Sequence, residues 1–194
     1  MNTALLVVDV QKVYTFADSE LSCPGAQATV NNVNRLVEHF EHAGSPVFFI
    51  RHIHKTDGSD LGRMFDYAGE PEEEFNFKEG SEEVQFDDAL RRPAGAVEIV
   101  KTRYSAFVGT DLDGALREND INRVVICGFM TNFCCESTAR DAHDRDYFVD
   151  FVIDATGTPG TESMEQEQIR SIVAEFLDEG FACTMTTDEY LKQH

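Results

Sequence analysis

Short apolar runs alternate repeatedly with stretches of helical periodicity along this chain. The alternation predicts a single α/β domain over residues 1–194, a three-layer α/β/α sandwich with a mostly parallel, doubly wound sheet, because parallel strands need crossover helices. The predicted strands are residues 4–10, 46–53, 96–101, 122–128, 147–153 and 181–185. The predicted helices are residues 25–43, 110–119, 131–145 and 163–179.

Three local signals refine this outline. Gly44 follows the helix predicted at residues 25–43 and is typical of a helix C-terminus. The segment 54–95 carries clusters of Gly, Asp and Glu without a sustained period, which indicates a long excursion with short helical pieces. Residues 187–193 are expected to form a tail after the last strand.

Charge excludes one large class of partner. The chain has 36 acidic and 16 basic residues, a formal net charge of −20, so nucleic-acid phosphates would be repelled by the average surface. A solvated acidic surface that aids solubility explains this balance, and a salt-adapted organism or a basic partner protein would also fit.

The sequence also carries indications of its compartment. The apolar runs are far shorter than the roughly 20 residues that cross a bilayer, and the N-terminus lacks a basic start and a signal-peptide cleavage site. The five cysteines, an odd number without metal-ligand spacing, are expected to be free thiols: Cys23, Cys127, Cys134, Cys135 and Cys183. We therefore expect a cytoplasmic protein without membrane contact.

Three reactive side chains fall where predicted strands end. Asp9 ends the first strand, Lys101 ends the third, and Cys134 follows the fourth, where a helix begins. Ligands of open parallel sheets bind outside the carboxyl ends of the strands, so the three residues are expected to meet at one edge. Taken singly, each residue type is more often structural: an Asp cap, a solvated Lys or an inert buried Cys.

Together, these three groups suit covalent hydrolysis. A thiolate is the working nucleophile, and a neighbouring cation and a helix N-terminus lower the pKa of a thiol, so Lys101 and the helix would activate Cys134. Asp9 would take the thiol proton as general base and return it to a leaving amine. Backbone N–H groups of the turn before Cys134 would form an oxyanion hole.

Four segments carry a resemblance to a known family. The segment 127–142, Cys-Gly-Phe-Met-Thr-Asn-Phe-Cys-Cys-Glu-Ser-Thr-Ala-Arg-Asp-Ala, resembles the signature turn and helix of the isochorismatase-like cysteine hydrolases. Leu-Val-Val-Asp-Val-Gln at 6–11, Lys-Thr-Arg-Tyr-Ser-Ala-Phe at 101–107 and Asp-Ala-Thr-Gly-Thr at 154–158 are similar to further blocks of that family in the same order. The resemblance covers nearly the whole chain and is nearest to the ureidoacrylate and N-carbamoylsarcosine amidohydrolases.

This resemblance implies roles for residues of the turn. It makes Asp9 the acid/base, Lys101 the stabiliser of the thiolate and Cys134, three residues after the Thr of the turn, the nucleophile. The adjacent Cys135 is then a packed helix residue. A cis peptide at residues 129–130 is also implied, with the N–H groups of Met130 and Cys134 as the oxyanion hole.

The resemblance also bears on metal and substrate. Related nicotinamidases hold a metal with an Asp-x-His pair after the second strand and a later His, whereas this chain has His52 and His54 there and no later His in the excursion. No metal is therefore expected, although a site on these two residues stays conceivable. Expected substrate-binding residues, with core packing or structural ion pairs as the alternative, are Phe16, His54, Arg103, Tyr104, Phe129 and Phe133.

The sequence thus predicts a hydrolase that cleaves a C–N bond of a small amide or ureido compound through a thioester, without an organic cofactor. Isochorismatases proper lack the cysteine of the turn, which disfavours vinyl-ether cleavage. The alternatives are a metal-assisted, nicotinamidase-like amidase and a non-catalytic acidic interaction protein on the same scaffold. The resemblance further implies a homo-oligomer, a dimer or a tetramer.

Overall fold

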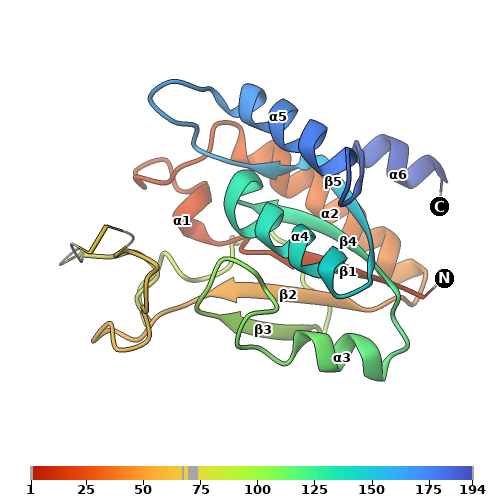
Figure 1. The fold of residues 1–194 in the computed structure, drawn as a ribbon, viewed down its shortest axis with the longest axis horizontal. Helices are drawn as coiled ribbons and strands as arrows, with labels where there is room; N and C mark the ends of the chain where they lie inside the picture. Colours follow the sequence, from red (N-terminus) through yellow and green to blue (C-terminus); the bar gives the residue numbers. More distant parts are fainter. Residues whose placement is uncertain (1, 67, 70–73, 194) are drawn as a thin grey trace.

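Six parallel strands form one sheet in the order β3-β2-β1-β4-β5-β6 (Figure 1). The computed structural model describes residues 2–66, 68–69 and 74–193. The strands are β1 (Thr3–Val8), β2 (Val47–His52), β3 (Val97–Lys101), β4 (Arg123–Phe129), β5 (Phe148–Gly157) and β6 (Cys183–Met185). Strand order reverses between β1 and β4, which confirms the doubly wound sheet and places a topological switch point at their carboxyl ends.

Helices cover both faces of this sheet, because the strand residues alternate between two apolar cores. Leu5 and Val7 of β1 belong to the core under α2 (Ala26–His42) and α6 (Thr187–Gln193). Ala4 and Leu6 belong to the core on the opposite face. That face is covered by α3 (Leu112–Glu118), α4 (Glu136–Asp144) and α5 (Gln166–Asp178) (Figure 1). The three-layer α/β/α sandwich predicted from the sequence is confirmed.

Several element boundaries differ from the sequence prediction. The helix predicted at 131–145 begins as a π-helix, η1 (Thr131–Cys135), and only then continues as α4. A short helix, α1 (Lys12–Thr15), follows β1, and the expected tail at 187–193 is the helix α6. Within the described part of the excursion, residues 54–66, 68–69 and 74–95, the chain forms turns and isolated bridges, so the short helical pieces predicted there were wrong. Figure 1 shows this segment beyond the carboxyl end of β2.

Two glycines are required by the backbone. Gly44 adopts φ +65° after α2, as predicted for a helix C-terminus, and a Cβ there would meet nothing within 4 Å. Gly128, near the end of β4, has φ +117°, and a Cβ there would lie 1.9 Å from the carbonyl oxygen of Val8. β1 and β4 therefore approach each other this closely at the switch point only because residue 128 lacks a side chain.

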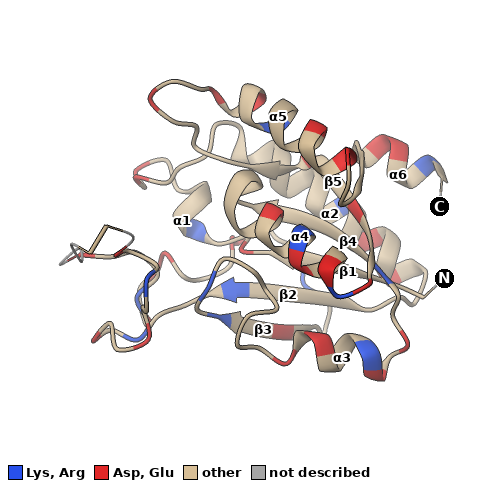
Figure 2. Ribbon diagram, viewed as in Figure 1, with Lys and Arg blue, Asp and Glu red and all other residues tan. Residues whose placement is uncertain are grey.

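The acidic residues are spread over the molecule. Figure 2 shows Asp and Glu on α2 to α6 and on the connecting loops, while Lys101 and Arg51 lie on the sheet. Among the described residues, no helix is both long and apolar enough to cross a membrane.

Candidate active site

The structure brings the three predicted catalytic residues together at the switch point. Asp9 follows β1 with φ +48°, Lys101 is the last residue of β3, and Cys134 lies in η1 directly after β4. The Lys101 Nζ lies 2.8 Å from Asp9 Oδ2 and 3.3 Å from Cys134 Sγ. Nζ also donates to the carbonyl oxygen of Arg103 at 3.0 Å. The ammonium group thus makes one ion pair and two hydrogen bonds, which fix its position.

Contacts across the strand ends hold this cluster. The N–H of Asp9 donates to the carbonyl oxygen of Ile50 in β2 at 3.0 Å, which anchors the turn after β1. The hydroxyl of Thr138 in α4 donates to the carbonyl oxygen of Cys134 at 2.6 Å and accepts from the N–H of Ala106 at 3.0 Å. Thr138 therefore ties the helix that carries the nucleophile to the segment that follows Lys101. The sequence motif contained Thr138, but no local signal revealed this role.

Burial sets the protonation of the cluster. Asp9, Lys101 and Cys134 are each 1% exposed or less. Burial raises the pKa of the Cys134 thiol to about 12, and the attraction of Lys101 only partly opposes it. The expectation of a lowered thiol pKa was therefore wrong, because loss of solvent outweighs the neighbouring cation. The resting sulfur is a protonated thiol.

The pKa values of the two charged partners, Asp9 and Lys101, are both raised. Burial raises the pKa of Asp9, and the charge of Lys101 opposes this shift. For Lys101, burial acts to lower the pKa, but the interactions with Asp9 and Cys134 together outweigh it and the net shift of the pKa is upward. A buried carboxylate of raised pKa is a stronger base than an exposed one, and it lies beside a lysine that stays charged.

The turn before the nucleophile has the predicted backbone. The Phe129–Met130 peptide bond is cis, which confirms the expectation. The Met130 carbonyl oxygen accepts hydrogen bonds from the N–H groups of Phe133 at 3.2 Å and of Cys135 at 3.1 Å. The side chain of Cys135 is fully buried in the core under α4, so Cys134 is the cysteine of this pair that faces the cavity described next.

A cavity of about 180 Å³ opens onto Cys134. Its walls are mostly apolar and aromatic, and they come from the turn, the segment after β3 and the excursion. The lining residues are Tyr14, Leu21, His52, Met64, Phe65, Asn76, Phe77, Tyr104, Met130, Phe133 and Cys134. A volume of this size fits a small molecule with one ring or a short chain.

The residues expected to bind substrate divide into two groups. Tyr104 and Phe133 line the cavity, with ring centroids 5.3 Å apart. Phe16 is 37% exposed near Lys12 instead, and Phe129 is buried in the core against Tyr14, at a centroid distance of 5.4 Å.

Arg103 and His54 also lie outside the cavity lining. The Nη1 of the Arg103 guanidinium donates to the carbonyl oxygens of Asp60 and Thr102, so backbone groups hold this side chain outside the cavity lining. His54 lies behind His52, with its Nε2 2.9 Å from the Nε2 of His52 and its Nδ1 3.3 Å from Asp60 Oδ1. The sequence prediction for these two residues did not anticipate that the excursion would fold over them and place Asp60 against both.

One group of described side chains could hold a metal ion. Ligand atoms of Asp9, His52 and Cys134 all lie within 4.8 Å of one another. The Lys101 ammonium already lies between two of these ligands, against both Asp9 and Cys134. A divalent cation would have to displace this positive charge, so the donor set fits the lysine better than a metal.

Gln11 positions the site, a role that its place in the motif at residues 6–11 did not reveal. Its side chain is fully buried and donates to the carbonyl oxygens of His52 at 3.0 Å and Val84 at 2.9 Å. Its Oε1 accepts from the N–H of His52 at 2.9 Å. Gln11 thus joins the end of β2 to the excursion, and it lies only two residues after Asp9.

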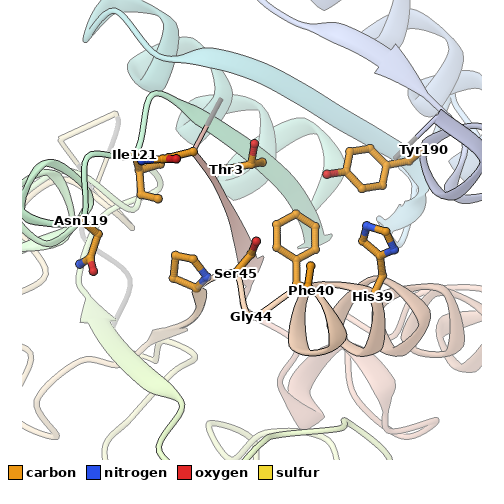
Figure 3. A pocket seen from close by; sticks show the side chains of 11 residues that line it. Thr3, His39, Phe40, Gly44, Ser45, Asn119, Ile121 and Tyr190 are labelled. Atoms are coloured by element: carbon orange, nitrogen blue, oxygen red, sulfur yellow. The ribbon is translucent and has the colours of Figure 1, made fainter.

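A larger cavity, of about 580 Å³, lies at the opposite end of the strands (Figure 3). It lies between the loop after α2, the start of β1 and the segment after α3. His39 and Phe40 of α2 face Tyr190 of α6 there, each at a centroid distance of 6.0 Å. Asp9, Lys101 and Cys134 do not line this cavity, and it lies away from the carboxyl ends of the strands, so we place the candidate active site at the smaller cavity.

A parallel α/β/α sandwich with a buried Asp–Lys–Cys cluster at its switch point defines a hydrolase class, and comparisons with known proteins agree. Residues 3–189 match the isochorismatase domain family. The chain belongs to the isochorismatase family, and it is a hydrolase of that family.

Two relatives and one solved structure illustrate the similarity. The chain is 27% identical to the ureidoacrylate amidohydrolase RutB of Variovorax paradoxus, over 98% of this chain and 81% of that protein. It is 34% identical to nicotinamidase 3 of Arabidopsis thaliana, over 84% of this chain and 76% of that protein. A cysteine hydrolase from Pseudomonas syringae pv. phaseolicola superposes with a TM-score of 0.90 at 30% identity, covering 99% of this chain and 92% of that one.

Proposed function

We propose that this protein hydrolyses a C–N bond of a small amide or ureido compound, with Cys134 as nucleophile. The observation that carries the proposal is the position of the Lys101 ammonium, in contact with both Asp9 and Cys134 beside the cavity. This arrangement holds a base, a cation and a thiol at the point where a substrate carbonyl can enter. Relatives named as a ureidoacrylate amidohydrolase and a nicotinamidase support a C–N substrate.

The reaction starts from the neutral thiol. As the sulfur of Cys134 attacks the carbonyl carbon, its proton passes to the carboxylate of Asp9, and Lys101 stabilises the negative charge that develops on sulfur. The N–H groups of Met130 and Cys134 stabilise the oxyanion of the tetrahedral intermediate. Because burial raises the pKa of Asp9, this carboxylate is a better acceptor for the thiol proton than an exposed one.

The second half of the reaction restores the enzyme. The tetrahedral intermediate collapses to a thioester, and Asp9 gives its proton to the leaving nitrogen, which departs as ammonia or an amine. Water then attacks the thioester carbonyl, with its proton taken by Asp9. The carboxylic acid leaves and the proton returns to sulfur. In total, one water is consumed and one C–N bond is cleaved.

Ammonia release from a panel of small primary amides and ureido acids tests this proposal. We expect turnover of at least one compound that fits a cavity of about 180 Å³. That turnover should be lost in Cys134→Ala and unaffected by a metal chelator. Loss of turnover on chelation would favour the metal-assisted amidase. Turnover that persists in Cys134→Ala would contradict the thiol mechanism, and no turnover across the panel would favour the non-catalytic reading.

A further inference from the structure

His52 is a polar residue of the cavity wall that takes no part in the proposed mechanism. It ends β2, is 1% exposed and lines the cavity beside Cys134. Its Nε2 lies 2.9 Å from the Nε2 of His54, whereas its Nδ1 is buried without a hydrogen-bond partner in the described part of the chain. An unpaired buried polar atom costs about 1–3 kcal/mol, so such an atom on a residue that lines the cavity indicates a ligand contact.

Both imidazoles of this pair are neutral. Burial lowers the pKa of His52 well below its usual value, and the charge of Lys101 adds to this effect. Burial also lowers the pKa of His54, although Asp60 opposes it. A neutral imidazole has one N–H donor and one acceptor nitrogen, so the partner of one nitrogen fixes the character of the other.

The contacts that run from Asp60 to His54 and from His54 to His52 fix the tautomers of both histidines. Asp60 presents a carboxylate oxygen to the Nδ1 of His54 at 3.3 Å, so this nitrogen carries the hydrogen. The Nε2 of His54 is then an acceptor, and the facing Nε2 of His52, 2.9 Å away, must be the donor. It follows that the Nδ1 of His52 has no hydrogen and offers a lone pair.

The cavity walls determine what this lone pair can meet. The described lining residues include no Lys or Arg, and the Lys101 ammonium beside the cavity is already in contact with Asp9 and Cys134. A substrate carboxylate would therefore find no unpaired cation there, and the chain carries a net charge of −20. An uncharged N–H group satisfies the lone pair, whereas an ester oxygen in the same place would face it with another lone pair.

We propose that Nδ1 of His52, held as an acceptor by Asp60 through His54, binds an N–H of the substrate, so that the site selects uncharged carboxamides over esters and acids. This proposal rests on the proposed function and assigns its substrate class. Asp60 and His54 are positioning residues, because they act through His52 and do not line the cavity.

The tautomer is measured without any substrate. Protein labelled with ¹⁵N-histidine and studied by long-range ¹H–¹⁵N correlation at neutral pH should show His52 with a bare Nδ1 and a protonated Nε2, assigned with His52→Asn. Asp60→Asn should shift His52 toward the Nδ1–H form, because an amide N–H can donate to His54. Asp57→Asn, an exposed acid of the same excursion, should leave the spectrum unchanged. A protonated Nδ1 in the unaltered protein overturns the proposal, whatever the activity.

A matched ligand pair tests recognition. N-methylbenzamide and methyl benzoate differ at one position, N–H against O. In Cys134→Ala, which cannot turn either over, the amide should shift the Nδ1 resonance of His52 and the ester should not. Equal shifts, or no shift with either compound up to its solubility limit, overturn the proposal.

The same pair is informative in the active enzyme. His52→Phe keeps a ring against Phe77 but removes the acceptor, and it should lower the ratio of kcat/KM on the amide to that on the ester about tenfold. An unchanged ratio contradicts the assignment of His52. Failure of the proposed function would be seen separately, as an absence of turnover with the tautomer intact.

Discussion

The ammonium nitrogen of Lys101 lies 2.8 Å from a carboxylate oxygen of Asp9, and both side chains are fully buried. A buried pair of opposite charges stabilises the fold only while both members are present, because each compensates the desolvation of the other. The pair therefore takes part in the proposed chemistry, and the loss of either member would also destabilise the fold. Variants that separate the two effects can be designed.

Lys101→Met should lower the free energy of unfolding by about 3 kcal/mol, because it leaves Asp9 as an uncompensated buried acid. The double variant Asp9→Asn/Lys101→Met should recover most of this stability, since no charge remains buried, while neither variant should turn over substrate. Urea unfolding of the three proteins at neutral pH measures this. A double variant less stable than the single one would show that the two side chains do not compensate each other.

The pair of adjacent cysteines gives a matched comparison. Cys134→Ala should reduce kcat by roughly three orders of magnitude or more, because it removes the nucleophile. Cys135→Ala should keep kcat within about tenfold and cost about 1 kcal/mol of stability, because it empties a little space in the core. The measurement is ammonia release at saturating substrate. Loss of activity only in Cys135→Ala would reverse the assignment of the nucleophile.

The pH dependence of the stability should report the two buried histidines. Burial lowers the folded-state pKa of both His52 and His54 below 6.5. Below pH 6.5 the unfolded chain therefore binds protons that the folded chain excludes, and the free energy of unfolding falls as the pH falls. Each group contributes a slope of at most about 1.4 kcal/mol per pH unit. Urea unfolding between pH 7 and pH 5 should show a shallower slope in His52→Asn than in the unaltered protein, and identical slopes would contradict the burial of a neutral His52.

The close approach of β1 and β4 at Gly128 predicts that a side chain there would destabilise the fold. Gly128→Ala should cost several kcal/mol, about 3 or more, because the new Cβ would lie 1.9 Å from the Val8 carbonyl oxygen at φ +117°. Gly44→Ala, at φ +65° with nothing within 4 Å, should cost only about 1 kcal/mol. Urea midpoints of the two variants measure the difference. Equal losses would show that the contact with Val8 can relax.

The sequence predicted those parts of the site that follow from strand ends. Asp9, Lys101 and Cys134 each end or follow a strand, and a parallel sheet brings such ends to one edge, so their meeting was predictable. The contact of Asp60 with His54 was not predictable, because it depends on the path of the excursion, whose sequence has no hydrophobic periodicity.

Two other features escaped prediction for physical reasons. The direction of the pKa shift of Cys134 depends on the depth of burial, which outweighs the neighbouring cation and cannot be read from residue types. Arg103 resembled a carboxylate ligand, but its Nη1 donates to the carbonyl oxygen of Asp60, which is distant in sequence, and to that of the adjacent Thr102.

In the proposed reaction, Cys134 carries the acyl group between the two halves. The most direct measurement is mass spectrometry of enzyme quenched in acid during turnover of a substrate found in the amide panel, with the adduct located by fragmentation. We predict an acyl mass on Cys134 that is absent in Cys134→Ala and still present in Cys135→Ala. An adduct on Cys135, or steady turnover with no adduct on any cysteine at the shortest quench times, would contradict the account.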